Sequence, residues 1–326
     1  MALIKCSGFD YLTPLAPASV LASLGFTNAT ILPGQGRAGG GAARLGQINL
    51  PARLGTFYCG FALGNPSGIE IDFNDSTLGY DFRLNFSSAG AVSCTLPNYT
   101  MVSSAPMAVI PGAVWQFIEV YGLISATAGA VTVRVNEIVV LALVSANTAH
   151  TTSTGVDQIS FGTGANNVIV DDFYICDSSG TSLNGFLGNT RVPAQVPSGA
   201  GASTGWTPTG SASANWQLAS NPYMDDSSYV SSGTPGTLDL YTLTPVANAP
   251  QILAAQSIVV ARQDDSGQRQ VQSVIQSGSA RATGTVVNTN GSFAGHTDIF
   301  PTDPNTGGSW SYQAVNALQV GAALVT

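Results

Sequence analysis

The chain has 326 residues, and although 44% of them are hydrophobic, only 9% are charged. Ordinary soluble proteins carry about 25% charged residues, so this surface is unusually neutral. The net charge of −8 and the ten scattered basic residues exclude a nucleic-acid groove, and no run reaches the about 20 apolar residues of a membrane-spanning helix.

The residue types favour an all-β fold. Thirty-seven glycines and 17 prolines, together with many Ser, Thr and Asn residues, supply turns. Residues that favour helices are scarce, since the chain has a single lysine, Lys5, and three glutamates, Glu70, Glu119 and Glu137. The length predicts two domains, each able to bury a core.

A series of strands is predicted between Trp115 and Arg191. The pattern of alternating apolar and polar side chains marks strands with one buried and one solvated face. These strands are predicted at 115–121, 131–136, 139–144, 156–161 and 168–176. Short glycine-containing connectors such as 125–130 suit hairpins, so an antiparallel meander is expected.

A domain boundary is predicted after Arg191. Residues 192–205 are rich in Pro, Gly and Ser, which is typical of a linker, and divide the chain into domains at 1–191 and 206–326. In the second domain, strands are expected at 237–243, 252–261, 271–276 and 282–287, with a turn at 264–267 and a hairpin at 288–291. This domain is expected to be a small β-sandwich.

Several of these segments resemble a known structural module. The motifs are Trp115…Glu119-Val, Gly129-Ala-Val-Thr-Val-Arg134-Val-Asn136, Asp171-Asp172-Phe-Tyr174-Ile-Cys-Asp177 and Asn184-Gly-Phe186-Leu-Gly188-Asn-Thr-Arg191. Together they look like the concanavalin A-like (laminin-G-like) sandwich of tailed-phage virion proteins. Motifs in the second domain, including Trp206-Thr-Pro and the ending Thr302–Gly321, resemble the module that follows it in those proteins. The likeness covers roughly residues 110–326, and residues 1–110 are assumed to complete the first sandwich.

The resemblance implies a structural part of a phage particle rather than an enzyme. Such a fibre, neck or capsid-decoration subunit is made in the bacterial host cytoplasm, associates with copies of itself as a trimer or higher oligomer, and docks on capsid, neck or tail proteins. An alternative is a carbohydrate-binding module that touches a host-surface glycan. No catalytic residue, cofactor or metal site is assigned, and the four tryptophans are interpreted as core or interface anchors.

The alternative of a glycoside hydrolase rests on Glu70-Ile-Asp72-Phe-Asn-Asp75. This segment is similar to the Glu-x-Asp-x-x-Glu strand of laminarinase-like glycosidases, which share the concanavalin A-like fold. Retaining hydrolysis needs two carboxyl groups roughly 5–5.5 Å apart. A bulge would have to bring Asp75 to the face of Glu70 and Asp72, and its side chain is shorter than that of glutamate. Asn74-Asp75-Ser76 also reads as the turn that ends a strand.

Other motifs predict no chemistry. Paired carboxylates such as Asp171 and Asp172 can bind calcium, but the favoured interpretation has one carboxylate capping a turn and the other facing solvent. Gly34-x-Gly36-x-x-Gly39 formally fits a dinucleotide loop, yet no amphipathic helix follows it. His150 and His296 lie in unrelated segments. The four cysteines, Cys6, Cys59, Cys94 and Cys176, form no CxxC motif, which favours a reduced protein while leaving disulfide pairing open.

Overall fold

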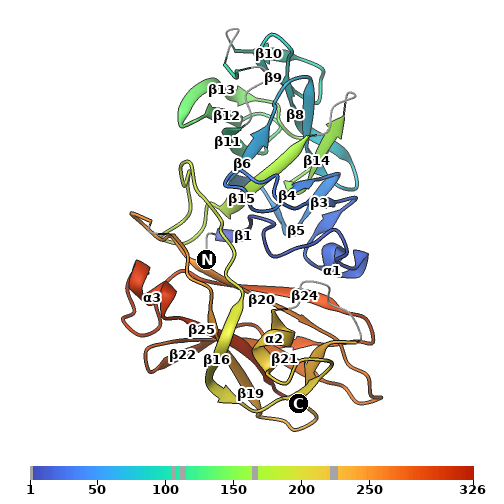
Figure 1. Ribbon diagram of the computed structural model, residues 1–326. Helices are drawn as coiled ribbons and strands as arrows, with labels where there is room; N and C mark the ends of the chain where they lie inside the picture. The colour runs from blue at the N-terminus through green and yellow to red at the C-terminus, as the bar shows by residue number, and fades with distance from the viewer. Residues whose placement is uncertain (1–2, 105–107, 111–114, 164–167, 221–226, 248) are drawn as a thin grey trace. The chain divides into compact units, whose positions relative to one another are not determined.

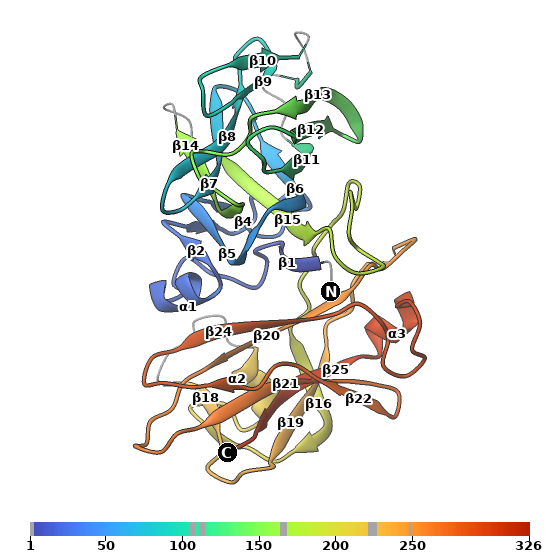
Figure 2. The ribbon, with the colours of Figure 1, turned by 180° about the vertical axis from the view of Figure 1, so that it is seen from behind.

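A computed structural model describes residues 3–104, 108–110, 115–163, 168–220, 227–247 and 249–326. The fold is nearly all β, as the composition predicts (Figures 1 and 2). Throughout the described part of the chain the strand pairs are antiparallel. The chain forms two compact units, one of Met1–Asp10 with Gly25–Pro193 and the other of Tyr11–Leu24 with Ala194–Thr326.

The first unit is a sandwich of two sheets. Sheet A contains, in spatial order, β13 (Ile138–Ala146), β12 (Gly129–Val135), β11 (Gln116–Leu123), β6 (Thr56–Gly64), β15 (Ile169–Asp177), β4 (Ala42–Arg44) and β3 (Thr30–Leu32), and β1 (Leu3–Ser7) also pairs with β15. Sheet B contains β10 (Met101–Ser103), β9 (Val92–Thr95), β8 (Gly79–Phe86), β7 (Ile69–Asp75), β14 (Val156–Thr163), β5 (Gln47–Leu54) and β2 (Phe26–Thr27). Residues before 110 thus contribute strands to both sheets, as assumed.

Aromatic side chains fill the space between the two sheets. Phe57 on β6 packs at 5.5 Å from Phe73 on β7, and Phe61 on β6 packs at 5.7 Å from Phe161 on β14 (ring centroids). All four rings are buried, and each buried aromatic of this size stabilises the fold by about 1.5–3 kcal/mol. The alternating burial along β7 places its odd-numbered residues in this core and its even-numbered ones on the outer face of sheet B.

The predicted meander is confirmed for β11, β12 and β13, which pair in sequence order. It does not continue, because β14 joins sheet B and β15 returns to sheet A between β6 and β4. Alternation marks a strand with one buried face, but both sheets offer such a face to the same core. Periodicity therefore predicted the strands and could not assign them to a sheet.

The second unit is built on a larger sheet and two strand pairs. The large sheet contains β16 (Pro197–Thr204), β19 (Leu238–Leu243), β25 (Gln319–Leu324), β21 (Gln270–Ser277) and β22 (Ala280–Thr283), with β23 (Val287–Asn288) beside β21. The pairs are β17 (Thr207–Thr209) with β18 (Tyr229–Ser231) and β20 (Ala255–Ala261) with β24 (Ala294–Phe300). The described residues of this unit also form three short helices: α1 (Ala18–Ser23), α2 (Asn215–Ala219) and α3 (Tyr312–Asn316).

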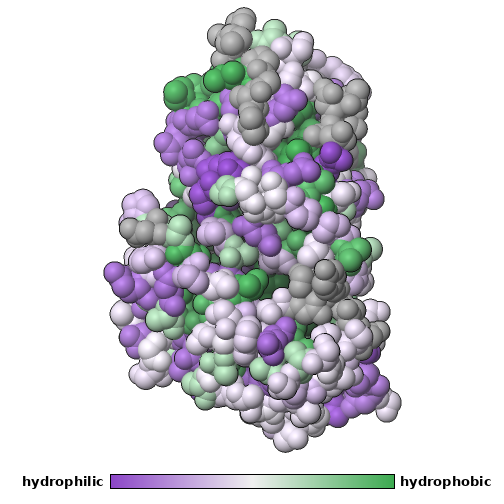
Figure 3. Space-filling view, in the orientation of Figure 1, coloured by the Kyte–Doolittle hydropathy of each residue, from purple (hydrophilic) through white to green (hydrophobic). Residues whose placement is uncertain are grey.

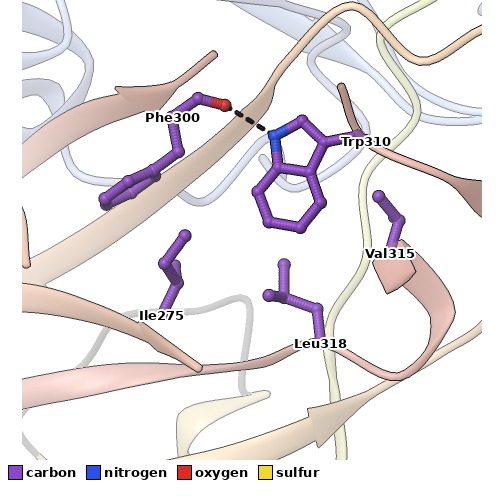
Figure 4. Packing of buried hydrophobic residues seen from close by; sticks show 5 residues of the cluster. All are labelled: Ile275, Phe300, Trp310, Val315 and Leu318. Atoms are coloured by element: carbon purple, nitrogen blue, oxygen red, sulfur yellow. Dashed lines mark hydrogen bonds between the residues drawn. The ribbon is translucent and has the colours of Figure 1, made fainter. Parts of the chain in front are cut away.

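Trp310 anchors a core cluster in this unit, as predicted. Figure 4 shows its ring among Ile275, Phe300, Val315 and Leu318, and its indole nitrogen donates a hydrogen bond of 2.8 Å to the carbonyl oxygen of Phe300. The motif at the end of the chain therefore has a packing role: it carries the tryptophan that closes the core.

Three predictions are wrong, two of them about domain boundaries and one about a hairpin turn. The predicted linker 192–205 contains β16, which pairs with β19; its Gly, Ala and Ser side chains carry no hydrophobic alternation, so the sequence pattern did not reveal a strand. Residues 11–24 belong to the second unit rather than to a domain 1–191, because α1 packs on β24 and the Ser23 hydroxyl accepts a 2.7 Å hydrogen bond from the Gly295 amide. The turn at 288–291 does not form a hairpin, since β23 pairs with β21 and β24 with β20.

Candidate functional site

The outer face of sheet B is covered by polar side chains. Along β7, Glu70, Asp72 and Asn74 point away from the core and are partly exposed. The neighbouring strands continue the same chemistry, and the complete set defines what we call the polar face: Thr27, Gln47, Asn49, Glu70, Asp72, Asn74, Arg83, Asn85, Ser93, Thr95, Gln158 and Ser160. Amides and hydroxyls predominate in this set.

Strand register aligns these side chains in rows that run across the sheet. The first row passes from Thr95 on β9 through Arg83, Asp72, Ser160 and Gln47 to Thr27 on β2. A parallel row is formed by Tyr80, Asn74, Gln158 and Asn49. Because residues directly opposite in a sheet lie about 4.5–5.5 Å apart, each row is a continuous line of polar groups.

Hydrogen bonds between strands fix the side chains of the rows. The Asn74 amide nitrogen donates to the Ser160 hydroxyl at 2.8 Å, and the Gln158 amide nitrogen donates to the Asn49 carbonyl oxygen at 3.0 Å. Each amide has two donor hydrogens and an acceptor oxygen, so these bonds leave further donors and acceptors available to a ligand. The face is thus pre-organised and still able to bind polar groups.

The charges on the polar face are paired with one another. The Arg83 guanidinium donates to both carboxylate oxygens of Asp72, one of them at 2.8 Å, and lies 3.2 Å from the Glu70 carboxylate. The hydrogen bonds that Arg83 donates to Asp72 raise the pKa of Arg83 above its ordinary value, so the guanidinium stays charged. Its centre also lies 5.0 Å from the Tyr80 ring centroid, and Tyr99 follows β9 with 82% of its surface exposed.

Asp75 points to the opposite side from Glu70. The bulge in the pairing of β7 with β8 lies in β8, where Asp81 is the extra residue opposite Phe73 and Asn74, so β7 keeps its alternation. The Asp75 side chain is fully buried, with hydrogen bonds from Thr77 and an ion pair of 2.8 Å to Arg53. Burial alone would raise the pKa of Asp75, but the Thr77 hydrogen bonds and the Arg53 charge outweigh it and lower the pKa. The carboxyl pair of the glycosidase alternative is therefore divided between the two faces of sheet B.

The motifs predicted around Glu119, Arg134 and Tyr174 meet in one buried cluster on the outer face of sheet A. Glu119 is fully buried; its carboxylate accepts hydrogen bonds from the Tyr174 hydroxyl (2.7 Å) and the Gly188 amide (2.9 Å) and pairs with Arg134 at 3.0 Å. The Arg134 guanidinium also lies 4.8 Å from the centroid of the Phe186 ring. The cluster, which we call the exit clamp, holds the segment after β15 onto the sheet.

The Tyr174 ring in the exit clamp requires a glycine on the neighbouring strand. Tyr174 is opposite Gly60 on β6, and a Cβ added at Gly60 would lie 2.2 Å from the tyrosine ring. No side chain fits there without moving the ring away from Glu119. The DDFYICD motif thus has a packing role.

Asp171 and Asp172 are both buried, so the prediction that one faces solvent is wrong. A bulge in β15 gives Asp172 a φ of 51°, and both carboxylates are buried. Asp172 pairs with Arg191 at 2.9 Å and with Arg37 at 3.4 Å, while Asp171 accepts a hydrogen bond of 2.7 Å from the Arg37 amide. No group of three or more potential metal ligands is found among the described residues.

The Asp171 carboxyl predicts a pH dependence of stability. Burial, and then the charge of Asp172, raise the pKa of Asp171 from 3.8 to about 7, with Asp10 adding repulsion and Arg37 opposing it. Because the folded state holds this proton more tightly than the unfolded chain, its contribution is present below pH 4 and is lost as the pH rises to 7. Asp81, with a pKa raised by burial to about 6, acts in the same direction.

We expect Asp171→Asn to reduce the loss of stability between pH 5 and pH 8 by about 1–2 kcal/mol. Denaturant unfolding of the first unit at both pH values measures this difference. Asp177→Asn, on the same strand but partly exposed, is the control and should retain the wild-type pH dependence. An unchanged pH dependence in Asp171→Asn would show that Asp171 is ionised in the fold.

The two histidines lie in different units, His150 after β13 and His296 on β24. No disulfide bond joins the four cysteines, all of which are described. None of the helices in the described ranges is long and apolar enough to cross a membrane.

No family model matches the chain, and neither does any curated protein. Among solved structures, a sialidase is 12% identical over 42% of this chain and 14% of its own (TM-score 0.32), so the chain spans a small part of that protein. An endo-β-1,4-glucuronan lyase from Trichoderma reesei is 12% identical over 46% and 88% (TM-score 0.33). Domain 4 of a Geobacillus stearothermophilus arabinanase, in complex with arabinotriose, is 14% identical over 54% and 93% (TM-score 0.33). Likeness at this level concerns the fold alone.

Proposed function

We propose that the first unit binds carbohydrate on the polar face of sheet B without cleaving it. The observation that carries this proposal is the set of amide and hydroxyl rows, fixed by hydrogen bonds and still partly exposed. Sugar hydroxyls both donate and accept hydrogen bonds, and the side-chain amides offer both partners at fixed positions. Tyr80 and the exposed Tyr99 add aromatic surface on which the apolar face of a sugar ring can pack.

The arrangement of carboxylates supports binding rather than hydrolysis. Glu70 and Asp72 share the polar face but both contact Arg83, and Asp75 faces the core. A retaining glycosidase needs a nucleophile and a separate acid across the scissile bond. Because the Asp75 side chain is buried on the core side of sheet B, the residues of the predicted motif do not provide that pair.

The proposal is tested by exposing the full chain to a panel of soluble and insoluble polysaccharides. We expect retention on at least one of them, with no new reducing ends released during prolonged incubation. Failure to bind any member of the panel would remove the carbohydrate-binding proposal. Release of reducing ends would replace it with an enzymatic one.

We propose as a second function that the chain is a structural subunit of a virus particle that associates with copies of itself, as the motif resemblance implies. The observation that favours it is an apolar edge of the first unit on β13, which we define as Ile138, Val139 and Val144, each more than half exposed. Figure 3 shows hydrophobic residues gathered where β13 lies. Within the described part of the chain β13 pairs only with β12, and its nine residues carry no charge. Such an edge is suited to pairing with another chain.

We expect the double variant Val139→Lys and Val144→Lys to shift the protein from oligomer to monomer, because two lysines on each copy would repel one another and remain solvated. Light scattering of wild type and variant measures the change in mass. Leu15→Lys, at a residue that is 68% exposed in the second unit, is the control and should leave the mass unchanged. A monomeric wild type would contradict self-association.

A further inference from the structure

We propose that the polar face selects uncharged polysaccharides and rejects polyuronates, an inference that rests on the carbohydrate-binding function proposed above. The geometry that points to it is the position of Arg83. Among the described residues of the polar face, Arg83 is the one cation, and it contacts both Asp72 and Glu70. The face therefore carries two carboxylates for one guanidinium and has no unpaired positive charge to offer an anionic sugar.

Glu70 gives the face a negative character toward solvent. Its side chain is 47% exposed, against 21% for Asp72 and 31% for Arg83. A carboxylate can accept hydrogen bonds from sugar hydroxyls but cannot donate one. A neutral sugar beside Glu70 thus gains hydrogen bonds, whereas a uronate would place a second carboxylate next to it, with like charges opposed.

A glycine leaves space for a sugar beside Glu70. Gly162 on β14 is directly opposite Glu70 on the outer face. A Cβ added at Gly162 would meet only the Cβ atom and carbonyl oxygen of Glu70, both at 3.7 Å, so the position is open apart from ordinary contacts. On the other side of Glu70 lies Asn85, whose amide donates to Thr95 at 3.0 Å. The open position thus adjoins one carboxylate, and the neighbouring strand presents amide and hydroxyl groups.

The rows also give the direction in which a polysaccharide would lie. Neighbouring strands are about 4.8 Å apart, which is close to the length of one pyranose unit in an extended chain. A polysaccharide that crosses the strands along the rows can therefore present one sugar to each strand. A uronate at every position would bring a line of negative charges past Glu70 and Asp72, while a neutral chain would meet amide and hydroxyl partners throughout.

The test compares binding of the full chain to neutral polysaccharides (β-1,4-glucan, mannan, linear arabinan) and to polyuronates (alginate, polygalacturonate) of matched length at low salt. We expect the best neutral polymer to bind at least about tenfold more tightly than either polyuronate. Equal or tighter binding of a polyuronate would overturn the inference while leaving carbohydrate binding intact. Binding to neither class would remove the proposed function itself.

A charge variant tests the role of Arg83 directly. Glu70→Gln with Asp72→Asn leaves Arg83 as the one charge on the face, and we expect the preference for neutral over uronate polymers to fall about tenfold, with uronate binding weakened by salt. Asp265→Asn, which removes the partner of Arg269 from an exposed ion pair in the second unit, is the control and should keep the wild-type preference. Glu70→Gln alone, at the more exposed position, should show a smaller fall in the same direction. An unchanged preference in the folded double variant would overturn the assignment.

Discussion

Replacing Arg134 by methionine is expected to lower the free energy of unfolding of the first unit by about 3 kcal/mol. The Glu119 carboxylate has no exposure to solvent, and Arg134 is its ion-pair partner at 3.0 Å. Methionine fills much of the arginine volume but supplies no charge, so the buried carboxylate would keep only the hydrogen bonds from Tyr174 and Gly188. The segment after β15 should loosen at the same time, because Phe186 loses the guanidinium beside its ring.

Denaturant unfolding combined with amide hydrogen exchange in β11 and β12 measures this loss. The double variant Glu119→Gln with Arg134→Met should recover a large part of it, because it removes the unpaired charge together with its partner. Arg281→Met, at an exposed arginine of the second unit, is the matched control and should change stability by less than about 0.5 kcal/mol. A loss below about 1 kcal/mol in Arg134→Met would show that water reaches Glu119.

The exit clamp illustrates what the sequence reveals and what it hides. Arg134 alternates with the valines of its strand, so the pattern predicts that it lies on a solvated face, and the strand register places Glu119 directly opposite it on the outer face of sheet A. An outer face is normally solvated. Here the segment that carries Phe186 and Gly188 returns across it and buries Glu119 completely. That contact joins residues far apart in the sequence, and no local sequence pattern predicts it.

The size of the side chains in a strand decided whether that strand could be predicted from the sequence. Strands with bulky apolar side chains, such as β11 and β21, were found because their alternation is strong. β16 has the sequence Pro-Ser-Gly-Ala-Gly-Ala-Ser-Thr, and its place in the sheet depends on main-chain hydrogen bonds and close approach. A Cβ at Gly201 would lie 2.5 Å from the Leu240 carbonyl oxygen, so small residues are needed there. The same composition is typical of linkers, and the sequence alone does not separate the two.

The polar face was missed for a different reason. The alternation along β7 is ordinary, and Gln47, Asn74 and Ser160 look like unremarkable solvent-facing residues in isolation. Their alignment depends on the register among strands that are widely separated in the sequence. A sequence signal did exist, since amides rather than lysines occupy the outward positions, but its meaning required the sheet order.

The triple variant Asn49→Ala, Asn74→Ala and Gln158→Ala is expected to weaken carbohydrate binding about a hundredfold. These three amides form one row, linked by the 3.0 Å hydrogen bond between Gln158 and Asn49 and a longer one between Asn74 and Gln158. Each amide lost removes about 0.5–1.5 kcal/mol of hydrogen bonding to a sugar. Stability should change little, because the side chains are partly exposed and their backbone pairing is kept.

Titration calorimetry with the polysaccharide that wild type binds best measures the loss, and circular dichroism verifies the fold. Gln268→Ala with Asn288→Ala is the matched control, since these amides also hydrogen-bond each other (3.2 Å) at exposed positions, but in the second unit. If the removal of exposed amides were harmful in itself, both variants would lose affinity for the carbohydrate equally. If the carbohydrate binds along the row on sheet B, only the triple variant loses affinity. Undiminished binding by the triple variant would place the carbohydrate elsewhere on the protein, because no ligand lying along this row could lose all three partners without cost.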